Sequence, residues 1–142
     1  MTLPGSGGGG GDFVTTEDSR RAGWGGGALR IIVAGTVDVT KTNRDVGVVR
    51  LMANGSLDTS FDGDGKRTDY FGASNGYGEI AYGIAVQSDG KILVVGSAFN
   101  GTNDDLALAR YTSSGSLDTT FDTDGKRTDY IGASNSQSEV AR

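Results

Sequence analysis

The sequence carries one stretch of 21 residues twice, at a fixed offset of 60 residues. Residues 55–75 return as residues 115–135. The three positions that differ are Ser60/Thr120, Gly63/Thr123 and Phe71/Ile131. Near-identity at a fixed period is typical of repeat proteins, in which each unit buries its apolar surface against the next unit. With 142 residues, the chain is expected to hold about two such units and the start of a third.

Apolar runs rich in β-branched residues occupy matching places in the two units, and turn signals separate them. The Asn54-Gly55 pair is the strongest of these signals, because both residue types accept a positive φ. No segment has a sustained apolar period of 3.6 residues, so almost no helix is expected. The expected strands are residues 29–34, 46–52, 80–86, 91–95 and 106–111, with 66–70 and 126–130 as outer fourth strands and with 37–45 and 100–105 as loops.

The central strand of the second unit is apolar at four successive positions, Ile92 to Val95. Antiparallel sheets usually have one wet face and alternate apolar with polar residues. Successive apolar residues instead favour cover on both faces, as in the stacked sheets of a propeller. The predicted fold is therefore all-β, with tandem blade-like antiparallel sheets of a β-propeller type.

The ends of the chain are read from composition. Residues 1–27 are expected to form a Gly-rich tail, in which Phe13-Val14 is a candidate for a short strand. The first blade is expected to be incomplete, because Gly-rich sequence stands where its first strand should be. Trp24 is expected to cover the edge of the first unit, in preference to stacking on a ligand. Leu57 and Phe61 are expected to pin the irregular linker to the core. The predicted division is 1–27 tail, 28–78 first repeat (incomplete blade plus linker), 79–138 second repeat (complete blade plus linker) and 139–142 start of a third repeat.

These motifs resemble the bacterial delta-60 repeat. The resemblance rests on residues 55–61 and their copy 115–121, the Asp-Gly-Lys that follows, and Ser88-Asp-Gly-Lys-Ile-Leu-Val-Val-Gly96. It covers roughly residue 28 to the C-terminus and implies β-propeller blades from large, secreted or surface proteins. The chain departs from the pattern at Asp62 and Asp122, where Gly is more usual, and two repeats are too few to close a ring.

Charge and composition exclude several functions. Thirteen basic and 18 acidic residues give a net charge of -5, which argues against nucleic-acid binding. Neither Cys nor His occurs, which excludes disulfides, imidazole bases and the usual zinc sites. No apolar run approaches the roughly 20 residues of a membrane helix, and residues 1–4 do not resemble a secretory signal. No nucleophile with a supporting base is found, so an enzyme is not expected.

Acidic residues recur in both linkers and raise the question of calcium. Each set ends in Asp-x-Asp-Gly, which brings two hard oxygen ligands to a tight turn. Lys66 stands where an EF-hand loop has a further ligand, so the alternative is that these side chains cap backbone N–H groups in turns. The candidate calcium ligands are Asp58, Asp62, Asp64, Asp118, Asp122 and Asp124.

Three further patterns each have a functional and a structural interpretation. Asn54-Gly-Ser56 and Asn100-Gly-Thr102 satisfy the N-glycosylation rule, but both lie in expected turns, and turn chemistry is favoured. Arg50 and Arg110 either bind an anion or pair with the linker residues Asp58 and Asp118, and pairing is favoured. The five tyrosines are expected to pack, in preference to stacking on sugars.

The predicted function is a structural or adhesive repeat module of an extracellular bacterial protein, without enzymatic activity. Its partner is expected to be a second copy, joined head to tail into a ring or a filament. The alternative is a ligand-binding propeller module, stabilised by calcium or binding carbohydrate.

Overall fold

The computed structural model describes residues 14–18, 29–40, 43–71 and 78–130. These residues form strands, turns and bends, and no helix occurs among them. The described part of the chain therefore contains no helix that could span a membrane. The strands are β1 (Val14–Asp18), β2 (Arg30–Thr40), β3 (Asn43–Met52), β4 (Lys66–Asp69), β5 (Ile80–Val86), β6 (Ile92–Phe99), β7 (Asp104–Tyr111) and β8 (Lys126–Asp129).

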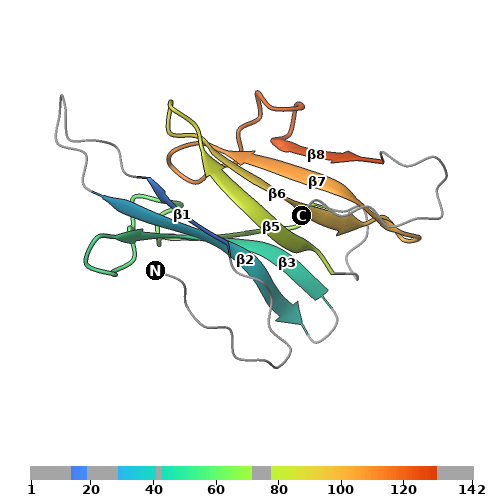
Figure 1. Ribbon diagram of the computed structural model, residues 1–142, viewed down its shortest axis with the longest axis horizontal. Coiled ribbons are helices and arrows are strands. Elements are labelled where there is room, and N and C mark those ends of the chain that lie inside the picture. The colour runs from blue at the N-terminus through green and yellow to red at the C-terminus, as the bar shows by residue number, and fades with distance from the viewer. Residues whose placement is uncertain (1–13, 19–28, 41–42, 72–77, 131–142) are drawn as a thin grey trace.

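The strands form two four-stranded sheets (Figure 1). The first, here called blade 1, has the order β1-β2-β3-β4, and the second, blade 2, has the order β5-β6-β7-β8. All neighbouring strands are antiparallel, so each blade is a simple up-and-down meander. The prediction of an all-β fold with tandem blade-like sheets is confirmed, as are the outer fourth strands β4 and β8.

The expectation that the first blade lacks its first strand is wrong. Strand β1 lies within the Gly-rich tail and pairs with β2, from Val14 opposite Ala34 to Asp18 opposite Arg30. A backbone ladder needs no particular side chains, so a polar segment completes the sheet where β2 offers an open edge. The wider division into repeats remains a prediction, and Trp24 and residues 139–142 lie outside the described residues.

The predicted loop at residues 37–45 is also largely strand. β2 continues to Thr40 and β3 begins at Asn43, so only the hairpin tip lies between them. Val37 faces Asp45 and Asp38 faces Arg44 across the ladder, and Nε of Arg44 contacts Oδ1 of Asp38 at 3.2 Å. The end of this hairpin is exposed, including Val37 at 40% and Val39 at 50%, so its strands keep their ladder without burying side chains.

The core lies between the two blades. β5 packs against β1, β2 and β3, and the buried side chains of the two sheets form one cluster. Its largest aromatic members are Tyr111, Phe61 and Phe71. The cluster is Ile32, Ala34, Val46, Val48, Phe61, Phe71, Ala81, Ile92, Val94, Ala98, Ala107, Ala109 and Tyr111.

The predicted cover on both faces of β6 is found on one face only. Ile92 and Val94 are completely buried against blade 1. Leu93 and Val95, which point the opposite way, are half-buried. The second face of blade 2 is thus apolar but has no sheet against it among the described residues.

The turn after Phe121 holds two non-glycine residues at positive φ, Asp122 at 46° and Thr123 at 70°. In the first repeat the second position is Gly63, at 84°. A left-handed conformation costs an L-residue roughly 1–2 kcal/mol, and β-branched residues suffer most. Thr123→Gly is therefore expected to stabilise the protein by roughly 0.5–1 kcal/mol, after allowance for the greater freedom of Gly in the unfolded chain.

Thermal unfolding would measure this as a rise in Tm of a few degrees. The matched variant Gly63→Thr, at the same place in the first repeat, should lower Tm. An unchanged or lower Tm for Thr123→Gly would contradict the strain at this position.

Candidate functional site

Each blade has two faces, because successive side chains of a strand point to opposite sides. When Gly35 is aligned with Gly96, equivalent residues can be named in both blades. We define the front face by Val33 and Val49 in blade 1 and by Val94 and Ala109 in blade 2. The back face is defined by Ile32, Ala34, Val46 and Val48 in blade 1 and by Leu93, Val95, Leu106 and Leu108 in blade 2.

The back face of blade 1 packs on the front face of blade 2. Ile32 and Val48 of the first surface are at most 2% exposed, and Ile92 and Val94 of the second are 0% exposed. Ala107 and Ala109 are also fully buried, and their small side chains allow the sheets to approach closely. One blade–blade interface is therefore complete within the chain.

The linker of blade 1 (residues 53–65, between β3 and β4) closes the edge of this interface. It lies over the turn of blade 2 that contains Ser114 and Gly115. Backbone N of Asp62 donates to O of Ser114 at 2.7 Å. Phe61 is 0% exposed, and a Cβ placed on Gly115 would lie 3.0 Å from Cδ2 of the Phe61 ring. The turn at Gly115 can accept the linker because Gly has no side chain there.

Two cations reach across the same interface. Nη1 of Arg50 donates to the carbonyl oxygen of Ser113, and the Arg50 guanidinium lies 5.0 Å from the centre of the Phe61 ring. Nζ of Lys126 donates to the carbonyl oxygen of Tyr70 at 3.2 Å and lies 4.7 Å from the centre of its ring. These polar contacts are directional and help to fix the orientation of one blade on the other, whereas the core between the blades is apolar.

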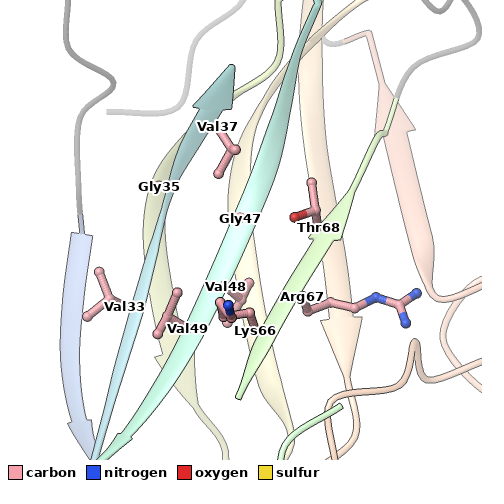
Figure 2. Close-up of a pocket in the computed structure, with 9 residues that line it drawn as sticks. All are labelled: Val33, Gly35, Val37, Gly47, Val48, Val49, Lys66, Arg67 and Thr68. Carbon is pink, nitrogen blue, oxygen red and sulfur yellow. The ribbon is translucent and has the colours of Figure 1, made fainter. Parts of the chain in front are cut away.

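The front face of blade 1 is hollowed and open. A hollow of about 190 Å³ lies over β2, β3 and β4 (Figure 2). It exists because Gly35 and Gly47 face each other across the ladder, and a Cβ on Gly47 would meet Cγ2 of Val37 at 2.3 Å. Its lining residues are Val33, Gly35, Val37, Gly47, Val48, Val49, Lys66, Arg67 and Thr68.

The open faces carry the same kinds of residue as the closed interface. Val33 and Val49 of the open front face are half-buried, whereas their counterparts Val94 and Ala109 are fully buried. On the back faces it is blade 2 that is uncovered and blade 1 that is buried. Leu93, Val95, Leu106 and Leu108 are half-buried there, whereas Ile32, Ala34, Val46 and Val48 are at most 2% exposed in blade 1.

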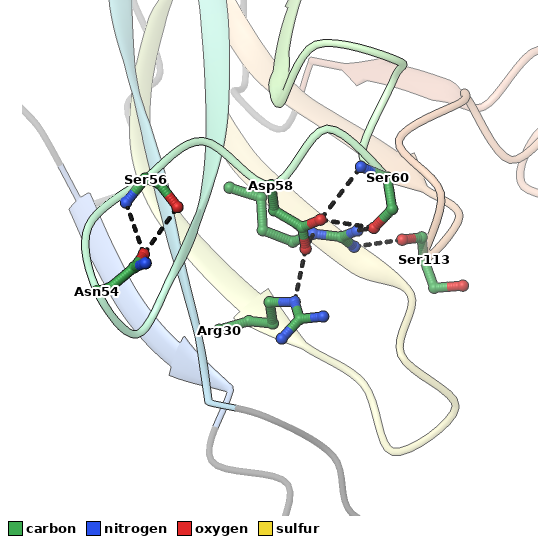
Figure 3. A network of polar contacts seen from close by, with 7 residues as sticks. Arg30, Asn54, Ser56, Asp58, Ser60 and Ser113 are labelled. Atoms are coloured by element: carbon green, nitrogen blue, oxygen red, sulfur yellow. Dashed lines mark hydrogen bonds and ion pairs between the residues drawn. The ribbon is translucent and has the colours of Figure 1, made fainter.

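Asp58 fastens the first linker to its blade (Figure 3). Its side chain is 1% exposed, and its Oδ2 accepts from Nε of Arg50 at 2.9 Å and from Nε of Arg30 at 2.5 Å. Oδ1 accepts from the backbone N of Ser60 at 3.1 Å and from its hydroxyl at 2.6 Å. The predicted Arg50–Asp58 pair is confirmed.

The second repeat reproduces this arrangement. Oδ2 of Asp118 accepts from Nε of Arg110 at 2.7 Å and lies 3.0 Å from Nζ of Lys91. Oδ1 accepts from the hydroxyl of Thr120 at 2.7 Å. The Arg110–Asp118 pair is thus also confirmed. The roles of Arg30 and Lys91 were not predicted, although a basic residue at the same place before both strands was a usable signal.

The surroundings of the Asp58 carboxyl lower its pKa. Burial raises its pKa, but hydrogen bonds from Ser60 and Arg30 and the charge of Arg50 outweigh burial and lower the pKa to about 2. In the unfolded chain the value is near 3.9. The group therefore contributes stability that is complete above about pH 4 and is lost as the pH falls through about 2.

An acid titration followed by circular dichroism should show this loss between about pH 4 and pH 2. In the variant Asp58→Asn the dependence of stability on pH should be shallower over the same window. Equal slopes for both proteins would show that Asp58 is not linked to acid unfolding.

The structure does not assemble the predicted calcium ligands. Among the described residues, no group of three or more acidic side chains could hold a metal ion. Asp58 and Asp118 are occupied by protein cations, and Asp62 lies 3.2 Å from Nη1 of Arg67. Oδ1 of Asp64 accepts from the backbone N of Lys66 at 2.8 Å, and Asp124 does the same with Lys126. Asp58, Asp64, Asp118 and Asp124 cap backbone N–H groups in turns, as in the alternative, whereas Asp62 and Asp122 pair with Arg67 and Arg127.

The other turn residues also bond locally. Oδ1 of Asn54 accepts from the backbone N of Ser56 at 3.0 Å, and Oδ1 of Asn100 accepts from the backbone N of Thr102 at 2.9 Å. Phe61 is buried, as expected of a linker anchor, but Leu57 is 40% exposed and was wrongly predicted to be one. Tyr111 is 0% exposed and packs as expected.

Comparison with known proteins gives one family. Residues 30–61 and 87–121, a little under half of the chain, match the model described as "Domain of unknown function (DUF5122) beta-propeller". No curated protein and no solved structure matches the chain. The matched stretches include β2 and β3 of blade 1 and the equivalent β6 and β7 of blade 2. Taken together with the two four-stranded antiparallel sheets, the match identifies the repeats as blades of β-propeller type.

Proposed function

We propose that this chain is a non-enzymatic structural module whose copies associate through the open front face of blade 1 and the open back face of blade 2. One observation carries the proposal. The front face of blade 1 exposes apolar positions, such as Val37 at 40%, while the equivalent face of blade 2 is fully buried against another blade. A sheet face that is apolar and uncovered marks an interaction site.

The chemistry of the hollow favours a protein partner over a sugar. Its walls are the apolar side chains of Val33, Val37 and Val49, and its volume of about 190 Å³ is below the roughly 300–1,000 Å³ of small-molecule pockets. Sugars are bound by several convergent hydrogen-bonding groups, whereas the polar lining residues here are Lys66, Thr68 and Arg67, of which Arg67 is paired with Asp69. A packed blade needs apolar surface, which this face supplies.

Association by unlike faces is heterologous, so it gives a ring if the rotation closes and a filament if it does not. Propellers close with about four to eight blades, which corresponds to roughly two to four copies of a two-bladed chain. Sedimentation velocity and light scattering should therefore detect masses at multiples of 14.6 kDa, with the larger species favoured at higher concentration. A folded species that stays monomeric up to millimolar concentration would overturn the proposal.

We further propose that the module works outside the cell, as part of a surface or adhesive protein of the delta-60 repeat kind. The resemblance of residues 55–61 and 88–96 to that repeat supports this. Protease treatment of intact native cells should remove the protein. Full protection on intact cells, with cleavage only after lysis, would contradict a surface location.

A further inference from the structure

We infer that the partner on these faces is a second copy of this chain in one fixed direction, with Phe121 and Asp122 of one copy seated on the Gly55 turn of the next. This inference rests on the proposed association and specifies its contacts. It follows from comparing each half of the chain with its repeat, because the closed interface within the molecule shows what each open group does when it is covered.

The turn that would receive the linker is open. In blade 2, a Cβ on Gly115 would meet Asp62 N at 2.8 Å and the Phe61 ring at 3.0 Å. In blade 1, a Cβ on the equivalent Gly55 would meet nothing within 4 Å among the described residues. Both glycines have positive φ, at 97° and 84°. The same turn is therefore present twice, and among the described residues it is covered at Gly115 and uncovered at Gly55.

The linker that would fill this turn is present at the other end of the molecule. Phe121 is the repeat of Phe61, and the Arg110 guanidinium lies 4.9 Å from the centre of its ring, as Arg50 does over Phe61. Phe121 is nevertheless only half-buried. Backbone N of Asp62 donates to Ser114 O, while Asp122 N has no backbone acceptor in the part of the chain described. Its counterpart acceptor would be O of Asn54 in a second copy.

A lysine and a tyrosine indicate the same direction of docking, with blade 2 of one copy against blade 1 of the next. Lys126 of blade 2 lies over the Tyr70 ring of blade 1. The repeat of Lys126 is Lys66, which is exposed at the rim of the open hollow. The repeat of Tyr70 is Tyr130, which directly follows β8, is half-buried and has a buried hydroxyl without a hydrogen-bond partner among the described residues. Docking by the repeat relation places Tyr130 of one copy under Lys66 of the next.

These groups are complementary only when unlike faces meet. Two front faces together would place one vacant Gly55 turn against another, with no aromatic ring to fill either. Two back faces would oppose Phe121 to Phe121 and leave both turns open. The contact must therefore join the back face of one copy to the front face of another.

Two variants, each blocked at one face, test this direction. Gly55→Asn adds a side chain to this turn, where Asn tolerates positive φ and meets nothing among the described residues of its own chain. Phe121→Ala removes the aromatic group from the other face. Each variant alone is expected to associate about 10–100-fold more weakly than the unaltered chain, as is usual for a central interface residue. An equimolar mixture should recover a 1:1 dimer, because each variant keeps the face that the other lacks.

The outcomes separate this inference from the proposed function. If the unaltered chain associates and both variants associate equally well, the contacts inferred here are wrong and association by another surface stands. If the variants are monomeric and their mixture is also monomeric, the direction is wrong. If the unaltered chain is a monomer, the proposed function fails, and the inference with it. Tyr130→Ala serves as a second back-face variant should Phe121→Ala lose the circular dichroism spectrum of the folded protein, and Asp124→Asn is the surface control.

Discussion

Phe61→Ala is expected to lower the free energy of unfolding by about 3–4 kcal/mol. The side chain is 0% exposed and lies between the blades, so its removal loses the transfer free energy of the ring and leaves a cavity. It also removes the aromatic face beneath the Arg50 guanidinium. Urea unfolding followed by circular dichroism measures the change. With a total stability of about 5–15 kcal/mol for a domain, such a loss brings the protein close to unfolding at room temperature.

The matched control is Phe121→Ala, at the same place in the second repeat. Its ring is half-buried, so truncation should cost the isolated chain only about 1 kcal/mol. The two substitutions are chemically identical and differ only in whether a neighbouring blade covers the ring. Equal losses of stability, measured at a concentration where the chain is monomeric, would contradict the difference in burial.

Asp58→Asn is expected to cost about 3 kcal/mol. Two guanidinium groups share its buried carboxylate, at 2.5 Å and 2.9 Å, and breaking a buried ion pair from one side leaves the partners uncompensated. The first linker should then detach from blade 1 and take Phe61 with it. Denaturant unfolding gives the loss in free energy, and hydrogen exchange at residues 58–65 should rise first.

Asp64→Asn is the control for Asp58, because it lies in the same linker and removes the same charge. Asp64 is exposed and, within the part of the chain that the structure describes, accepts only from the backbone N of Lys66, a bond that the amide oxygen of Asn can replace. Its effect should fall within about 0.5 kcal/mol. A large loss for Asp64→Asn would mean that net charge, and not the buried pair, governs stability.

The local parts of the fold were predictable from the sequence because they depend on contacts between near neighbours. Arg50 and Asp58 lie eight residues apart, on a strand and the linker after it, and their repeat spacing was enough to predict the ion pair. The turn at Asn54-Gly55 and the strands with β-branched residues were predicted for the same reason. Strand β1 was predicted only as a possible short strand at Phe13-Val14, because its pairing depends on the open edge of β2 and not on its own composition. The exposed ends of β2 and β3 were missed because ladder bonds in an exposed hairpin require no buried side chains.

The sequence by itself determined the repeated unit, its all-β character and the ion pairs that fasten each linker to its blade. The tertiary structure decided which copy of each residue is buried. Phe61 and Phe121 stand in nearly identical sequences, as do Gly115 and Gly55, yet only the first of each pair is covered. The physical reason is that burial depends on what lies across the sheet face. A repeat gives both blades the same faces, and only their stacking determines which face meets another blade and which meets water.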